Sequence, residues 1–294
     1  MVDFLSKLSY NKIMIFIENR LENKIIEKLS KGSIFSPDLI SAIAKENKVT
    51  EQGVYKALSF LIGNEIVTKS NKLLSLNTFW IERLKDFTNQ VSETYNTSDF
   101  ENFLMLDDKE KLTYNFKDTT KLDIHWMHII LLMLKHFSEK PFVIYNPHCW
   151  FMIERPHTES VFFDWINKNN KLMFFLIGGD AALDKVVKKQ VESKNIKIEL
   201  DSENRFPKDK YVAIISDYII YTSYGLDFNK KMDNFFKSHK EINNEVVDNF
   251  KNIIKENGGS KIIIERNKTK AIKLSKQITK NHYVPLEVKD KILN

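Results

Sequence analysis

The most useful set of polar side chains lies between residues 51 and 59, where the apolar residues repeat at helical spacing. With those apolar residues turned inward, the opposite face presents Glu51, Gln52, Tyr55, Lys56 and Ser59. Amide and ammonium groups can reach base edges in a DNA major groove, while hydroxyl groups can bind phosphate. We therefore expect this face to contact double-stranded DNA.

A second polar group follows directly at Lys69, Ser70, Asn71 and Lys72. These residues form the tip of an expected hairpin, and a short basic tip suits the phosphate backbone or the minor groove. Glu51 is unfavourable beside phosphates, although a carboxylate can accept a hydrogen bond from cytosine. Any solvated helix also carries such residues, so the same surface is compatible with docking to a protein.

The histidines and the only cysteine do not form a metal or nucleophile motif. His125 and His128 are three residues apart on an expected helix, and His148 precedes Cys149. This spacing is not H-E-x-x-H, and a structural zinc site would need further ligands. We expect no metal site, no cofactor and no catalytic residue.

Two loops could contribute to a binding site. Gly178-Gly179-Asp180 comes before an expected helix, where N–H groups can bind an anion, but it lacks the P-loop pattern. We expect a structural turn in which Asp180 is the N-cap. Arg155 and His157 precede another expected helix and could line a pocket.

Three helices and a hairpin would position the first polar face. Apolar spacing predicts helices over 19–32 and 36–47, the second with Ser36 as its N-cap and Pro37 in its first turn. Thr50 is expected to cap the third, which ends at Gly63-Asn64. Two short strands joined by Ser70-Asn71 then end at residue 77.

This order of elements resembles the winged helix-turn-helix domain of microbial transcription regulators. The resemblance rests on "SPDLISAIAKENKVTEQGVYKALSFLIGNEIVTKSNKLLSLN" and covers about residues 19–77. It implies a winged helix-turn-helix domain over residues 1–77, with the third helix as the recognition helix. Winged helices also serve as protein-interaction modules, so both uses stay open.

The segment 78–120 is expected to hold a linker helix and a polar connector. Its apolar residues recur at nearly heptad spacing, which indicates either a dimerisation helix or a helix packed on the preceding domain. The expected dimer contacts are Trp80, Leu84, Phe87 and Val91.

Residues 121–294 read as a mixed α/β domain, because apolar strands alternate with amphipathic helices. In "KYVAIISDYIIYTSYGLDF" the layout resembles phospholipase-D-like domains, which carry H-x-K-x-x-x-x-D. With Asp217 at the aspartate place, Lys210 stands for the histidine and Val212 for the lysine. The resemblance therefore implies a non-catalytic relative, as in sugar-responsive regulators of the TrmB type, with a role in dimerisation or sensing.

Composition limits the setting. The 294 residues carry a net charge of +6, but the last 44 residues hold 11 basic against 4 acidic residues, and residues 1–95 only 13 against 11. The small net positive charge around the expected recognition helix would give weak DNA binding by a monomer. We therefore expect a dimer, or additional DNA contacts from the basic C-terminal segment. One cysteine and no long apolar segment suggest a cytoplasmic protein without membrane partners.

Together these features predict a homodimeric DNA-binding transcription regulator with a possible small-molecule effector. The alternatives are a protein-interaction adaptor and, less favoured by Lys210 and Val212, a phosphodiesterase-like enzyme.

Overall fold

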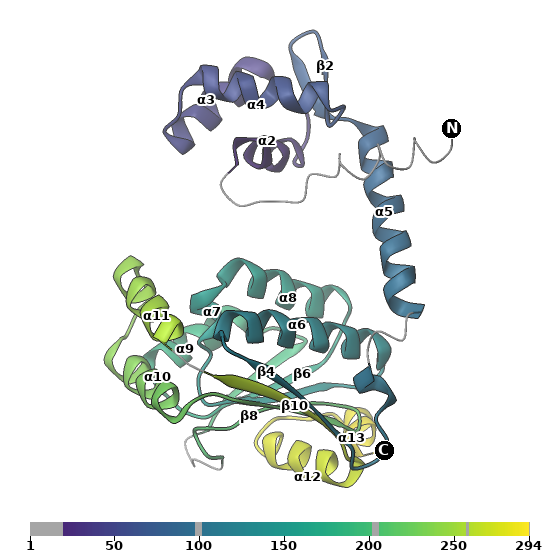
Figure 1. Ribbon diagram of the computed structural model, residues 1–294, viewed down its shortest axis with the longest axis vertical. Helices are drawn as coiled ribbons and strands as arrows, with labels where there is room; N and C mark the ends of the chain where they lie inside the picture. Colours follow the sequence, from purple (N-terminus) through teal and green to yellow (C-terminus); the bar gives the residue numbers. More distant parts are fainter. Residues whose placement is uncertain (1–19, 98–101, 202–205, 257–258, 294) are drawn as a thin grey trace. The chain divides into compact units, whose positions relative to one another are not determined.

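The computed structural model divides into two compact units, Met1–Phe100 and Glu101–Asn294, which are described separately. It describes residues 20–97, 102–201, 206–256 and 259–293. The protein is of the mixed α/β class, and each unit contains one sheet with helices packed against it (Figure 1). Among the described residues, no helix is both long and apolar enough to cross a membrane.

Between residues 20 and 97, the N-terminal unit has three short helices, a small sheet and one long helix. In chain order these elements are α2 (Leu21–Leu29), β1 (Ile34–Phe35), α3 (Ser36–Asn47), α4 (Glu51–Gly63), β2 (Val67–Ser70), β3 (Leu73–Leu76) and α5 (Thr78–Thr97). The antiparallel sheet has the order β1-β3-β2, so the expected hairpin is present and gains a third strand.

The turn between α3 and α4 fixes where α4 begins. Lys48 adopts a left-handed conformation with φ of 54°, and Thr50 Oγ1 accepts a hydrogen bond from the Gly53 N–H at 3.2 Å. The expected Thr50 cap is thus confirmed. The expected Ser36 cap is wrong: Phe35 is the N-cap, and Ser36 donates its own N–H to the Lys72 carbonyl in the sheet.

The core of this unit joins α2, α3, α4 and the sheet. The expected inward residues of α4 are buried, namely Val54, Ala57, Leu58 and Leu61. Ile62 was also expected to face inward, but it is 36% exposed because it lies at the margin of that stripe.

The C-terminal unit is built on a seven-stranded mixed sheet of order β4-β10-β9-β8-β5-β6-β7. The strands are β4 (Lys111–Phe116), β5 (Phe142–Asn146), β6 (Met173–Ile177), β7 (Ile196–Leu200), β8 (Tyr211–Ile215), β9 (Tyr218–Ser223) and β10 (Ser260–Arg266). The β5, β6 and β7 strands are parallel, whereas β8 is antiparallel to both β5 and β9.

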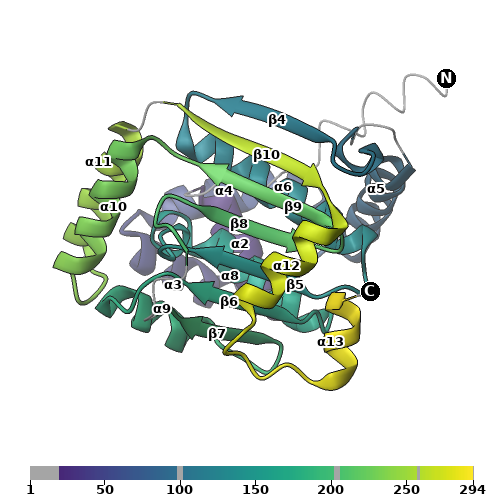
Figure 2. The ribbon, with the colours of Figure 1, turned by 90° about the horizontal axis from the view of Figure 1, so that it is seen from below.

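Helices cover both faces of this sheet, as the apolar strands predicted. They are η1 (Asn102–Met105), α6 (Thr119–His136), α7 (Phe151–Glu154), α8 (Pro156–Lys168), α9 (Ala182–Val191), α10 (Leu226–Ser238), α11 (Asn244–Glu256), α12 (Lys268–Ile278) and α13 (Leu286–Leu293). One face packs against α6, α8 and α9, and the other against α12 and α13. The α10 and α11 helices lie beyond one end of the strands (Figure 2).

The segment expected to be a linker and connector is divided between the two units. Its first part is α5, and its last part contains β4, which pairs with β10 at the edge of the large sheet. The expected polar connector is thus wrong over β4, where Leu112, Tyr114 and Phe116 alternate with polar residues as in a half-buried strand.

Candidate functional sites

The polar face of α4 is exposed in the described part of the N-terminal unit. Glu51, Gln52, Tyr55, Lys56 and Ser59 are all exposed, and so are Lys69, Ser70, Asn71 and Lys72 in and beside the β2–β3 turn. Asn71 has a φ of 55°, which places it at the tip of that turn. Among the described residues, none forms an ion pair with Lys56, Lys69 or Lys72. In the described part of the chain, their ammonium groups are therefore not neutralised by a carboxylate.

The same helix also exposes apolar side chains. Tyr55 and Phe60 are each 49% exposed, and the Phe35 and Leu73 pair between β1 and β3 is exposed as well. A solvated recognition helix does not need Phe60 on its surface, so this ring is the feature that favours a protein partner.

The expected dimer contacts lie in different surroundings along α5. Trp80 is 7% exposed and belongs to the core of its own unit, and Leu84 packs against that core. Phe87 is half-buried, whereas Val91 is exposed. The first turns of α5 are thus a packed part of the N-terminal unit, so Trp80 and Leu84 are not free to form the expected dimer contacts, whereas Val91 is exposed.

The phospholipase-D-like positions have separate environments in the C-terminal unit. Lys210 is exposed just before β8, Val212 is buried within β8, and Asp217 lies in the β8–β9 turn. Asp217 accepts a hydrogen bond from Arg266 Nε at 2.8 Å, which ties the turn to the end of β10. Asp217 therefore has a structural partner in this chain.

Among the histidines that the sequence analysis weighed as metal ligands, His148 has two carboxylates beside its ring. Its Nδ1 lies 2.9 Å from Asp184 Oδ2, its Nε2 lies 3.4 Å from Asp233 Oδ1, and its ring stacks on Phe236. Against the effect of burial, hydrogen bonds from Lys208 and Lys237 lower the pKa of Asp233 to about 2. No group of three possible metal ligands occurs among the described residues.

The turn at Gly178-Gly179-Asp180 lacks the expected Asp180 cap. Ala181, not Asp180, is the N-cap of α9, and Asp180 is exposed and lies 3.6 Å from Lys185. Gly178 is required because a Cβ there would lie 2.4 Å from the Tyr145 hydroxyl. The turn thus serves close packing next to β5.

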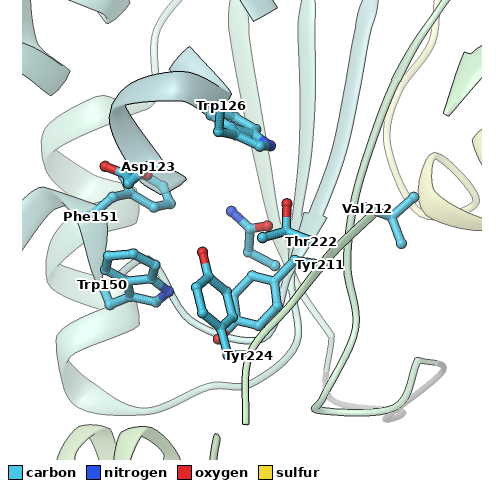
Figure 3. Close-up of a pocket in the computed structure, with 9 residues that line it drawn as sticks. Asp123, Trp126, Trp150, Phe151, Tyr211, Val212, Thr222 and Tyr224 are labelled. Carbon is cyan, nitrogen blue, oxygen red and sulfur yellow. The ribbon is translucent and has the colours of Figure 1, made fainter. Parts of the chain in front are cut away.

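A small cavity lies where β5 and β9 end and β8 begins. Ligand sites of α/β folds occur at this kind of sheet edge. The lining residues are Asp123, Trp126, Asn146, Trp150, Phe151, Tyr211, Val212, Thr222 and Tyr224. Trp126 closes the cavity opposite Tyr211 and Tyr224, and Thr222 lies across from Asp123 (Figure 3). Its volume of about 20 Å³ is enough for one water-sized group.

Three polar atoms around this cavity have no hydrogen-bond partner among the described residues: Trp150 Nε1, Tyr211 Oη and Thr222 Oγ1. The side chains are 2%, 5% and 4% exposed. Trp150 and Tyr211 lie near each other, and donation from the indole to the phenol would still leave Thr222 and the phenolic proton unpaired. A buried polar atom without a partner costs about 1–3 kcal/mol, so Thr222 Oγ1 and the phenolic proton of Tyr211 are the groups that lack a partner at this cavity.

A buried charged cluster stands behind the Asp123 wall. Arg155 binds Asp123 Oδ2 through Nη2 and lies 3.5 Å from Glu159 Oε1. Burial raises the pKa of Asp123 despite Arg155, and burial together with Asp123 raises that of Glu159 to about 8. Glu154, bound by Thr120, also has a pKa raised by burial. Two carboxyl groups, Asp123 and Glu159, thus share one guanidinium, and Glu154, next to Arg155 in sequence, has a partner of its own.

Sequence reasoning had noted only Arg155 of this cluster, and it placed Arg155 correctly before a helix. The side chain of His157 lies outside the described part of the chain. The cavity residues come from α6, β5, α7, β8 and β9, so no local spacing joins them. The position of Asn146 and Tyr224 at strand ends was the available signal.

Comparisons with protein-family models and with curated proteins found no match to this chain.

Proposed function

We propose that this protein is a DNA-binding transcription regulator, in which α4 and the β2–β3 hairpin of a winged helix-turn-helix unit bind double-stranded DNA. The observation that carries the proposal is one surface with two parts: the exposed polar face of α4 and the unpaired lysines beside it. Such a surface offers side chains for base edges and others for phosphates.

The α3–α4 arrangement supports this reading. The two helices are joined by only Lys48, Val49 and Thr50, and the Thr50 cap fixes the start of α4. A recognition helix needs a fixed start, because its first residues approach the bases.

In this proposal the C-terminal unit, of phospholipase-D-like layout but without catalytic activity, senses an effector or dimerises, and the protein acts in the cytoplasm. A dimer would double the phosphate contacts of a unit with few cations. The likeness to regulators of the TrmB type supports the domain order only.

The test is binding of the purified full chain to random-sequence duplex DNA, followed by fluorescence anisotropy across a salt titration. With Lys56, Lys69 and Lys72 in contact, we expect the slope of log K against log[salt] to be about −2 to −3 per chain. A slope near zero, or no binding at low salt, would overturn the proposal.

Phe60 favours a second candidate, in which the same helix docks on a partner protein. The salt titration separates the two, since docking centred on an aromatic residue depends little on counterion release.

A further inference from the structure

A groove lies between α12 and α13, the two helices that pack on one face of the large sheet (Figure 2). Its volume of about 270 Å³ is far larger than that of the cavity beside Asp123 and is close to that of sites for small organic ligands. The groove therefore has room for a small molecule. The lining residues are Lys276, Thr279, Lys280, His282, Val284, Lys289 and Ile292.

The charge of the groove is positive. Three lysines and no acidic residue line it among the described residues. Lys276 comes from the last turn of α12, Lys280 follows the end of that helix, and Lys289 comes from α13. Within the described part of the chain, Lys276 and Lys289 form no ion pair. The groove therefore attracts an anion.

The number of cations indicates the kind of anion. A phosphate monoester carries up to two negative charges and three terminal oxygens, and each ammonium group is a compact charge with three N–H donors. A carboxylate or a phosphate diester has one charge and two such oxygens, so it uses fewer of the three cations. The Thr279 hydroxyl already donates to the Ser275 carbonyl at 2.8 Å, so the contacts to an anion fall to the lysines.

A buried imidazole lines the same groove. His282 is 8% exposed, and its Nε2 lies 3.2 Å from the Phe175 carbonyl oxygen, so this nitrogen carries a proton. Its Nδ1 is buried without a hydrogen bond of normal geometry, although the carbonyls of Lys197 and Ile278 lie near the ring. Burial lowers the pKa of His282 below its ordinary value of 6.5, so the ring is neutral at pH 7.5.

We propose that this groove binds a small organic phosphate monoester, with its phosphate group held by Lys276, Lys280 and Lys289 beside the His282 ring. The C-terminal end of α12 disfavours an anion, but Lys276 and Lys280 lie at that end and offset its partial charge. The site itself is independent of DNA binding. A role of the ligand as the effector of a regulator rests on the proposed function.

A pH effect follows from the charges around His282. Glu199 of β7 favours the imidazolium form, whereas Lys276, Lys280 and Lys289 of the groove oppose it. A bound anion offsets the lysines, so binding should be accompanied by proton uptake at His282 and should tighten as pH falls from 7.5 to 5.5. Sulfate is the probe for this effect, because it stays a dianion over the whole range.

The experiment is a titration of the full chain with methyl phosphate at pH 7.5 and constant ionic strength, followed by the imidazole Cε1–H signals in NMR spectra. The chain has seven histidines, and His282→Asn assigns the signal of His282. The phosphorus signal of methyl phosphate gives a second readout that needs no assignment. We expect saturable binding of methyl phosphate and of inorganic phosphate. Dimethyl phosphate and acetate, each with a single charge, should bind at least tenfold more weakly.

Two pairs of lysine substitutions test the contacts. Lys276→Gln with Lys289→Gln should weaken methyl phosphate binding at least tenfold, because two charge-assisted contacts are lost. The matched control is Lys268→Gln with Lys273→Gln, which removes the same charge from exposed positions of α12 that do not line the groove. It should bind within about twofold of the wild type, since salt screens these charges from the site. All four side chains are exposed, so both variants should fold.

The proposal is overturned if methyl phosphate shows no saturable binding, or if dimethyl phosphate or acetate binds equally well. An equal loss of affinity in the two lysine pairs would also overturn it, because the effect would then reflect the overall charge of the chain. Sulfate binding that does not tighten at pH 5.5 would place the anion away from His282 and contradict the site as assigned. All of these results are read without DNA, so they are independent of the DNA-binding test.

Discussion

Polar residues serve this protein in two opposite settings. The α4 face keeps its polar groups in water, where they cost nothing to the fold and remain available to a partner. The C-terminal cavity buries its polar groups, where each must be paired or occupied. Substitutions on α4 should therefore change binding alone, whereas substitutions around the cavity should change stability.

The largest loss of stability should come from substituting Arg155, because this residue is the cation of the buried charged cluster. Arg155→Met leaves Asp123 and Glu159 buried without their cation, and breaking such a pair costs about 3–5 kcal/mol in the free energy of unfolding. Urea denaturation of the full chain would measure this change.

The matched control is Lys185→Met, because Lys185 and Asp180 form an exposed ion pair in the same unit. An exposed pair contributes at most about 1 kcal/mol, so this variant should unfold nearly like the wild type. Equal losses in the two variants would remove the contrast between buried and exposed polar groups.

The next effect is a loss of DNA binding with no loss of folding stability. Changing Gln52, Tyr55 and Lys56 together to Ala should weaken DNA binding by about 100-fold, since contacts to bases are worth about 1–3 kcal/mol each. The midpoint of thermal unfolding should not fall. Fluorescence anisotropy and calorimetry provide the two measurements.

Its control is Lys85→Ala with Gln90→Ala on α5, which removes the same charge from another exposed helix. Wild-type affinity in the α4 variant, or an equal loss in the α5 control, would show that α4 is not the recognition helix.

A smaller effect should appear in the pH dependence of stability. The pKa of Glu159 is raised to about 8 in the folded chain, so the folded state holds a proton that the unfolded state releases above its ordinary pKa of 4.5. Stability should therefore fall as pH rises from about 4.5 to 8, by about 1–3 kcal/mol. Glu159→Gln should flatten this part of the profile, and an unchanged slope would show that Glu159 is not the cause.

The smallest effect tests the two ends of α5. Val91→Asp should leave the free energy of unfolding nearly unchanged, because Val91 is exposed. If α5 forms the dimer, this charge should weaken self-association by roughly tenfold, as sedimentation can measure. A wild-type chain that sediments only at its monomer mass of 34.6 kDa would exclude the dimer.

Local signals predicted more of the N-terminal unit than of the cavity. The Thr50 cap and the β2–β3 turn lie within a few residues of the groups they bind, so short spacing was enough to find them. Ser36 differed because a strand pairing took its N–H, and this contact depends on Lys72, far along the chain.

The cavity could not be predicted in the same way. Asp123 and Thr222 are separated by nearly 100 residues and line the same cavity only because the fold brings α6 and the end of β9 together. Periodicity identifies the buried side of an element, but it does not say which elements become neighbours. The β4 strand could have been predicted, because its apolar and polar residues alternate. It was not predicted because this edge strand lies in an otherwise polar segment.

The most direct test of the central claim is hydrogen exchange of the full chain with and without duplex DNA at low salt. We expect slower exchange in α4 and in the β2–β3 hairpin, with α5 unchanged. Protection confined to α12 and α13 of the basic C-terminal end, or no protection in α4, would contradict the assignment of the N-terminal unit as the DNA-binding part of this protein.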